Sequence, residues 1–270
     1  MRVKELVIIV SVIIFILHAA LALSVGALGY LLPPRDVRQV AKWYLRTTFN
    51  PFHKFFSAMA PEAVTAVVWD YRGLDTLFET AVFFLAIIGS VAIMRGITGS
   101  EGLGRGMSLI VKTVTKITLG MIIAVAASIA LHGHLTPGGG FQGGATAAVA
   151  PLLVLVIFSK LFLEKRGVSK DSMLVMRSIG LLGVGLAAFI VLLIALPLGV
   201  NAYVFQNQPK PYAPIGFPYQ VGGNLIGGTL ILFNIFEMFA VAAGFTIVFL
   251  LLAIPESSVI KFLRGETHEA

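Results

Sequence analysis

Cysteine is absent from the 270 residues of this chain. Its absence excludes disulfide bonds, iron–sulfur ligation, c-type haem attachment and a cysteine nucleophile together. Charge is also scarce, because only 12% of the residues are Asp, Glu, Lys or Arg, whereas an average globular chain has about 25%. So few charges cannot cover a water-soluble globule, and most of the surface therefore has to face lipid.

Apolar sequence is abundant instead: 57% of the residues are hydrophobic and the mean hydropathy is +0.93. A helix needs roughly 20 apolar residues to cross a bilayer, and six runs are long enough. They are residues 6–32, 74–94, 107–131, 141–163, 173–198 and 225–254. We therefore predict an all-α membrane protein with about six transmembrane helices and no sizeable aqueous domain.

The distribution of Lys and Arg over the loops sets the predicted orientation. With both termini on one side, that side carries eleven of these residues and the other side seven, six of them in the segment 33–73. Because cytoplasmic loops are the richer in Lys and Arg, we predict that both termini face the cytoplasm. The basic excess then reflects membrane topology, and no nucleic-acid partner is expected.

The segment 33–73 is the longest polar stretch of the sequence. Two prolines at its start end the first helix. Between residues 37 and 46, apolar side chains alternate with Arg and Lys at helical spacing. This pattern predicts a short amphipathic helix on the outer membrane face or on a partner. An ordered surface loop without a specific ligand is the alternative.

Ionisable side chains inside a membrane span are costly and mark candidate functional sites. Glu79 lies in the second predicted span, with Thr76 three residues and Asp75 four residues before it. At this spacing the three side chains share one helix face. Such a stripe suits the entry of a proton or a hydrated Na+. The alternative is an interfacial carboxylate that pairs with Arg72.

Glu237 lies near the middle of the sixth predicted span, and Asn234 is on the same helix face. A polar stripe among Phe and Met side chains has to face protein rather than lipid. It either takes part in ion movement or only hydrogen-bonds a neighbouring helix. Lys116, in the third span, is a further candidate for the ion path, although snorkelling to the interface explains it as well.

The segment 132–144 is the most specific one, with the sequence HGHLTPGGGFQGG. Its candidate helix-packing residues are Gly139, Gly140, Gly143 and Gly144. Their small-xxx-small spacing lets two backbones approach closely. Alternatively, the stretch is a broken helix start whose backbone groups face a polar cavity. His132 and His134 lie at its mouth, and they either handle ions or are merely interfacial. No metal site is predicted.

Two segments resemble known families. Residues 132–144, preceded by residues 112–131, resemble the signature of the MnhB-like subunit of Mrp-type Na+/H+ antiporters, and the four predicted helices after residue 101 match that whole protein. Residues 63–79, AVTAVVWDYRGLDTLFE, resemble the C-terminal part of the large Mrp subunit and the small protein that replaces this part in membrane-bound hydrogenases. The chain therefore resembles two fused subunits, residues 1–100 and 101–270.

The resemblance implies a non-redox, multi-pass subunit of a plasma-membrane complex, either a free-standing antiporter or a hydrogenase-like respiratory complex. Its implied partners are other Mrp-type subunits, the lipid bilayer, Na+ and H+, with no cofactor and no enzymatic activity in this chain. The family's candidate for ion handling falls on Glu79. Phe78 stands where a glycine is common, and Asn234 where Asp is common. A purely structural subunit, with the ions passing elsewhere, is the alternative function.

Overall fold

The computed structural model describes residues 3–26, 37–97 and 107–265. The chain divides into two compact units, Met1–Trp43 and Tyr44–Ala270. The first unit contains α1 (Val3–Ser24), an apolar helix whose described side chains are exposed almost throughout. A helix that is apolar on every side needs lipid or protein around it.

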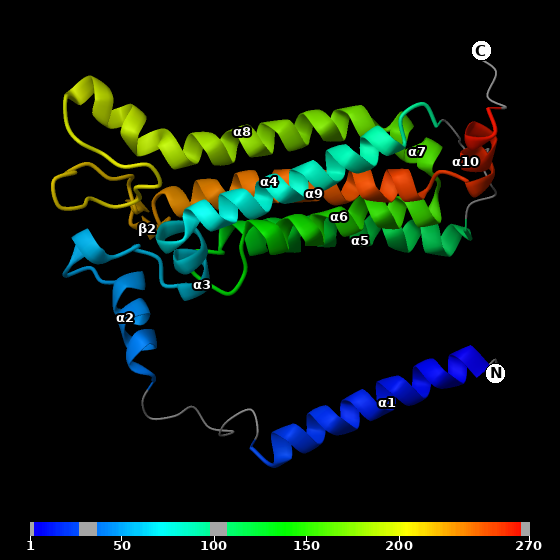
Figure 1. Cartoon of the computed structure of the whole chain (residues 1–270), viewed down its shortest axis with the longest axis horizontal. Coiled ribbons are helices and arrows are strands. Elements are labelled where there is room, and N and C mark those ends of the chain that lie inside the picture. Colours follow the sequence, from blue (N-terminus) through cyan, green and yellow to red (C-terminus); the bar gives the residue numbers. More distant parts are fainter. Residues whose placement is uncertain (1–2, 27–36, 98–106, 266–270) are drawn as a thin grey trace. The chain divides into compact units, whose positions relative to one another are not determined.

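The second unit is a helix bundle arranged around its last long helix (Figure 1). Its spanning helices are α4 (Gly73–Ile93), α5 (Leu109–Leu131), α6 (Gly140–Ile157), α8 (Lys170–Ala195) and α9 (Thr229–Leu252). Helix α9 contacts each of the other four and has the largest buried share of these helices. It is therefore the axis against which the rest of the bundle packs.

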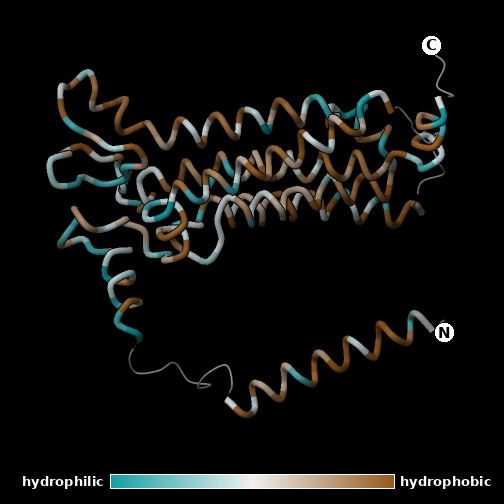
Figure 2. The backbone as a smooth tube through the Cα atoms, viewed as in Figure 1, coloured by the Kyte–Doolittle hydropathy of each residue, from teal (hydrophilic) through white to brown (hydrophobic). Residues whose placement is uncertain are grey.

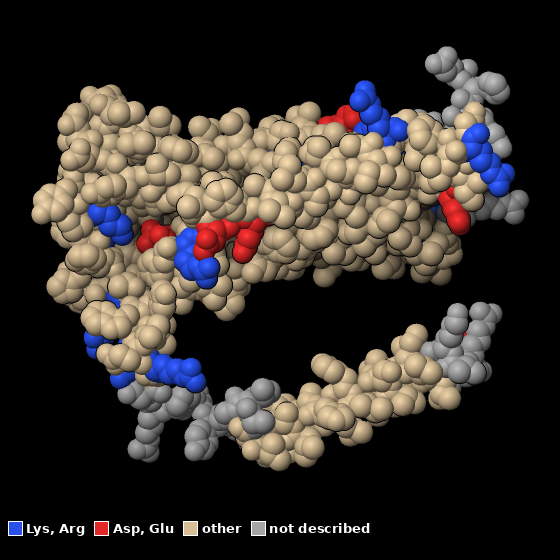
Figure 3. Space-filling view, in the orientation of Figure 1, with Lys and Arg blue, Asp and Glu red and all other residues tan. Residues whose placement is uncertain are grey.

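In the described part of the chain, six helices are long and apolar enough to cross a bilayer. This confirms the predicted all-α fold with six spans. Hydrophobic residues predominate along the helices, and hydrophilic residues are more frequent in the end loops (Figure 2). On the face shown in Figure 3, charged side chains of the bundle likewise lie toward its two ends. This distribution is the one that a bilayer demands.

The predicted helix bounds agree with the structure to within a few residues, except at the ends of the first and fourth spans. The first predicted span reaches residue 32, but α1 ends at Ser24. The fourth predicted span reaches residue 163, but α6 ends at Ile157. There, Ser159 accepts a hydrogen bond from the Phe162 amide and caps a separate short helix, α7 (Lys160–Lys165). The segment 27–32 of the first predicted span lies outside the described residues. So does the predicted domain boundary near residue 100, which stays a prediction.

At one end of the bundle, α8 continues into η3 (Leu196–Leu198), followed by a loop with a small antiparallel hairpin. The hairpin consists of β1 (Gln220–Val221) and β2 (Asn224–Leu225), with Gln220 opposite Leu225. Asn207 holds this end together, because its side-chain amide donates to the carbonyls of Ala58 and Gly227. The opposite end carries α10 (Glu256–Leu263).

The segment 33–73 does contain the predicted short helix, α2 (Gln39–Thr48). It is followed by η1 (Lys54–Phe56), α3 (Ala63–Thr65) and a π-helical turn, η2 (Ala66–Tyr71). The expectation of a surface loop is wrong for the second half. Met59 is fully buried, and Trp69 stacks on Phe233 of α9 with ring centroids 4.3 Å apart. Apolar side chains here fill the end of the bundle.

The two ends of the bundle give a direct test of the predicted orientation. Ser257 in α10 and Tyr212 in the loop after α8 are both exposed, at opposite ends of α9. In this cysteine-free background, Tyr212→Cys should react with an impermeant maleimide from outside intact cells, and Ser257→Cys only after the cells are opened. Labelling of Ser257→Cys from outside would overturn the orientation.

Candidate functional site

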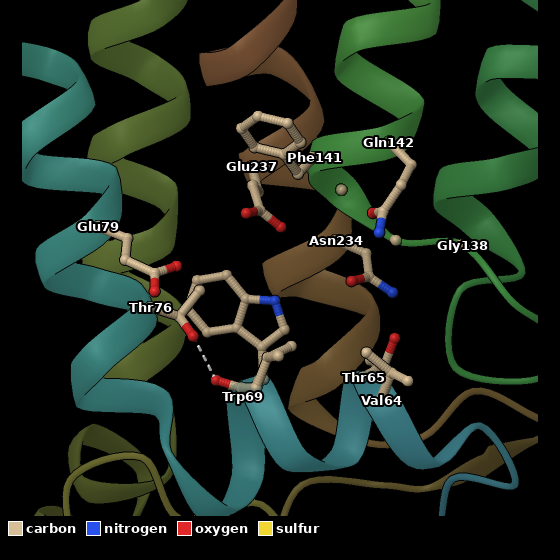
Figure 4. Close-up of a pocket in the computed structure, with 13 residues that line it drawn as sticks. Val64, Thr65, Trp69, Thr76, Glu79, Gly138, Phe141, Gln142, Asn234 and Glu237 are labelled. Carbon is tan, nitrogen blue, oxygen red and sulfur yellow. Dashed lines mark hydrogen bonds between the residues drawn. The ribbon is translucent and has the colours of Figure 1, made fainter. Parts of the chain in front are cut away.

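A polar cavity of about 150 Å³ lies inside the second unit, where α4, α9, η2 and the start of α6 meet (Figure 4). Its polar lining comes from Thr65, Thr76, Glu79, Gln142, Asn234 and Glu237. The cavity lies beside the first turns of α4, α6 and α9. Polar side chains inside a span have to serve one another or an occupant of the cavity.

Glu237 is buried on α9, and its carboxylate points into the cavity (Figure 4). The Trp69 indole and the Phe141 backbone amide both lie near this carboxylate. Helix α6 comes close enough to supply the Phe141 amide because residue 140 is glycine. A Cβ at Gly140 would lie 2.6 Å from the Glu237 Cβ. The close approach of α6 to α9 thus builds this wall of the cavity.

Asn234 lies one turn before Glu237 on α9 and lines the same cavity. Its side chain is 1% exposed, and neither its amide nitrogen nor its oxygen has a hydrogen-bond partner among the described residues. A buried amide without partners costs roughly 1–3 kcal/mol. Both atoms are therefore available to water, a proton carrier or a cation inside the cavity.

Glu79 is on α4 and lines two hollows at once. It contributes to the cavity and also to an open groove along the outer side of α4, together with Asp75 and Phe78. Its side chain is exposed in the isolated chain, yet it is near enough to Glu237 for the two carboxylates to interact electrostatically. Glu79 is thus the polar residue shared by the interior cavity and the outer face.

The predicted stripe of Asp75, Thr76 and Glu79 is divided between these two hollows. Asp75 faces the groove and pairs with Arg72 at 2.6 Å, while both side chains remain exposed. Thr76 lines the cavity, and its hydroxyl donates to the Val68 carbonyl at 2.6 Å. The Arg72 pairing that the sequence offered as an alternative for Glu79 is therefore made by Asp75.

The other predicted ion-path residues lie outside the cavity. Lys116 is exposed on α5. His132 is exposed just after α5, with its ring nitrogen 3.0 Å from the Ser128 carbonyl. His134 is buried in the loop, where its ring bonds the Leu225 carbonyl. Burial lowers the pKa of His134, and the hydrogen bond to Leu225 opposes that shift. A neutral His134 therefore serves to fasten this loop to β2.

Both interpretations of the glycine segment, cavity lining and close helix packing, are supported, each by different residues. Gly139 and Gly140 line the cavity, and Gly139 has a φ of 147°, which favours glycine. Gly143 packs on α5, where a Cβ would lie 2.8 Å from the Ala130 Cβ. Gly144 packs on α9, where a Cβ would lie 2.7 Å from the Val241 Cβ. The first pair shapes the cavity, and the second pair closes the helix contacts.

Sequence reasoning did not single out Trp69 or Arg177. Trp69 lies in a segment expected to be a loop, so only its size and its place within the motif of residues 63–79 could have indicated it. Arg177 lies within the fifth predicted span, and the rule that intramembrane charges are functional candidates should have included it. It is fully buried, and its Nη1 donates to the Ala240 carbonyl at 3.0 Å.

A family model described as a domain related to the MnhB subunit of Na+/H+ antiporters matches residues 110–247. These residues make up more than half of the chain and supply Gly139, Gly140, Asn234 and Glu237 to the cavity. The chain belongs to this MnhB family. It is a multi-pass membrane protein of MnhB type, and the wall formed by η2 and α4 precedes the matched domain.

Relatives of this MnhB-type chain occur in two solved assemblies. One is a chain of the membrane-bound sulfane sulfur reductase, an archaeal respiratory membrane complex. It is 26% identical with a TM-score of 0.58, and the match covers 94% of this chain and 100% of that one. The other belongs to the Mrp complex from Dietzia sp. DQ12-45-1b. It is 14% identical with a TM-score of 0.57, and the match covers 95% of this chain and 26% of that one. It shows the same fold.

An uncharacterized protein of Methanocaldococcus jannaschii is 29% identical over a match that covers 36% of this chain and 44% of that relative. The chain thus matches less than half the length of this curated relative.

The packing of Gly143 leads to a paired test of the MnhB segment. Gly143→Leu should destabilise the protein by about 1–3 kcal/mol, because the added side chain meets the α5 backbone. Gly120→Leu should be tolerated, since nothing lies within 4 Å of a Cβ at this exposed α5 position. Thermal unfolding of the solubilised, assembled protein checks both. Equal stability, with transport lost only in Gly143→Leu, would assign residue 143 to the cavity instead.

Proposed function

We propose that this chain is a non-redox membrane subunit of a multisubunit Mrp-type cation/proton antiporter module. In this role, the cavity forms part of a Na+ or H+ path, and the helices scaffold neighbouring subunits. One observation carries the proposal: Glu79 and Glu237, on different helices, line the same intramembrane cavity. Two carboxylates at membrane depth are costly unless they handle ions or are paired, and they have no basic partner among the described residues.

The cavity supplies the chemistry that such a path needs. A carboxylate at this depth can take up and release a proton, since neutralisation relieves its desolvation. The unpartnered Asn234 amide and the carboxylate oxygens also suit a partly dehydrated cation, which binds to oxygen atoms at broken helices in other transporters. Which of the two ions uses the cavity depends on the neighbouring subunits.

The position of Glu79 supports a role within a larger complex. Its side chain is exposed on the bundle surface at a depth where lipid would surround the isolated chain. A carboxylate is not stable against lipid tails. A neighbouring protein, or water enclosed by it, therefore has to cover this side chain. The solved relatives belong to multisubunit membrane complexes, and this chain is proposed to assemble in the same manner, in the plasma membrane.

A purely structural subunit is the second candidate, and one observation favours it. The Glu237 side chain already packs beside Trp69 of η2 and the start of α6, so it helps to hold η2 and α6 against α9. A glutamate held in this way can serve packing alone. Redox chemistry, where the complex has any, is assigned to other chains of the complex, and no cofactor is proposed for this one.

The transport proposal predicts the order of effects at Glu79. Glu79→Gln keeps the volume and hydrogen bonding but removes the ionisable group, so it should leave assembly intact and abolish coupled Na+ or H+ movement. Glu79→Asp keeps the charge one methylene shorter and should retain part of the activity. Transport measured in membrane vesicles that contain the fully assembled complex checks both variants.

Asp171→Asn is the matched control, because it removes an exposed carboxylate near the start of α8, outside the cavity lining. It should transport like the wild type. Wild-type transport by Glu79→Gln would remove Glu79 from the mechanism and leave the structural role standing.

The exposure of Glu79 also predicts that the chain is inactive alone. Purified and reconstituted by itself in liposomes, it should show no Na+/H+ exchange, whereas the assembled complex exchanges these ions under the same gradient. Fluorescence quenching of a pH-sensitive dye follows the exchange. Exchange by the isolated chain would contradict its role as a dependent subunit.

A further inference from the structure

Arg177 of α8 is a buried charge that the proposed path does not use. Its side chain is 0% exposed. Its Nη1 donates to the Ala240 carbonyl, whereas Nε and Nη2 have no hydrogen-bond partner among the described residues. Its remaining neighbours are aromatic: the guanidinium carbon lies 4.7 Å from the Phe83 ring centroid and 5.5 Å from that of Phe84.

This guanidinium lies beyond one end of the cavity. On α4, Phe83 is one helical turn past Glu79, and on α9, Ala240 is one turn past Glu237. Both helices run in the same direction along the bundle (Figure 1). Arg177 therefore lies about one turn, roughly 5 Å, from the cavity, toward the end of the bundle where α4 and α9 finish. The charge is fixed between three helices rather than mobile in a loop.

The described bundle interior offers a cation few ligands in this direction. Past Glu237, the buried side chains of α9 are small or apolar apart from Thr246. The hydroxyls of Thr246 and of Thr80 on α4 each donate to a backbone carbonyl of their own helix. The buried residues of α6 past the cavity are Gly and apolar residues alone. In the described interior beyond the cavity, Arg177 is thus the charged side chain that an ion would meet.

We infer that Arg177 closes this end of the cavity to cations, so that an ion reaching Glu79 and Glu237 leaves sideways through the α4 groove. A fixed positive charge in a dry interior repels Na+ strongly. Glu79 lines both the cavity and the groove, and it provides the polar connection to a neighbouring subunit. This inference rests on the proposed ion path and specifies its direction.

A buried charge without an acidic partner carries a desolvation cost. A neutral side chain of similar size at residue 177 avoids this cost, so Arg177→Gln should still assemble. A purely structural Arg177 would instead act through its hydrogen bond to Ala240, which joins α8 to α9. Loss of this bond would reduce the amount of assembled complex in both Arg177→Gln and Arg177→Lys. The barrier role depends on the positive charge alone, so it predicts different Na+ leaks for the two variants.

The test uses the purified, assembled complex in liposomes loaded with 22Na+, with no pH gradient and no substrate. Arg177→Gln should assemble and raise the passive Na+ leak by about tenfold or more, equivalent to lowering the barrier by roughly 1.4 kcal/mol. Arg177→Lys keeps the charge and should leak like the wild type. Lys170→Gln removes an exposed charge from the same helix and should also leave the leak unchanged.

A wild-type leak from assembled Arg177→Gln would overturn the barrier. So would equal leaks from Arg177→Gln and Arg177→Lys. Neither result touches the role of Glu79, because that role is measured as coupled transport under a gradient. Conversely, wild-type transport by Glu79→Gln together with a leaky Arg177→Gln would show that cations enter the cavity without being coupled there.

Discussion

The close packing of α6 against α9 is the contact on which the site depends. At Gly140 and Gly144 the α6 backbone approaches α9 so closely that a Cβ would meet the Glu237 side chain and the Met238 carbonyl. Between helices in a bilayer, such packing replaces the hydrophobic effect as the source of association. A side chain at either position would separate the helices. The Phe141 amide would then move away from the Glu237 carboxylate, and that wall of the cavity would open.

The segment before α4 supplies the cap of this arrangement. Trp69 stacks on Phe233 and lines the cavity beside Glu237, while Thr65 donates to the Gly133 carbonyl at 2.6 Å. These contacts join the segment before α4 to the MnhB domain at the cavity itself. The residues matched to MnhB therefore form only part of the cavity wall, and η2 and α4 supply the rest.

Hydropathy and helical spacing were sufficient to predict the six spans, since a bilayer constrains length and composition so strongly. The pairing of Glu237 and Asn234 on one face also followed from spacing. The meeting of Glu79 with Glu237 did not, because it depends on which helices are neighbours. Trp69 escaped prediction for a related reason: a polar segment of the sequence folds back into the bundle, and no local pattern shows that the end of the bundle needs filling.

The two departures from the family pattern act at different places. Phe78 is 61% exposed and lines the α4 groove rather than the cavity, so its ring shapes the surface on which a neighbouring protein meets Glu79. Asn234, in contrast, lies inside the cavity with both polar atoms unpartnered among the described residues. An amide in place of a carboxylate there lowers the negative charge by one while keeping an oxygen that can bind a proton donor or a cation. Glu237, one turn further along α9, then carries the charge on this helix. The cavity is lined by one carboxylate from α4 and one from α9, and in the proposed path a proton would pass between these two helices.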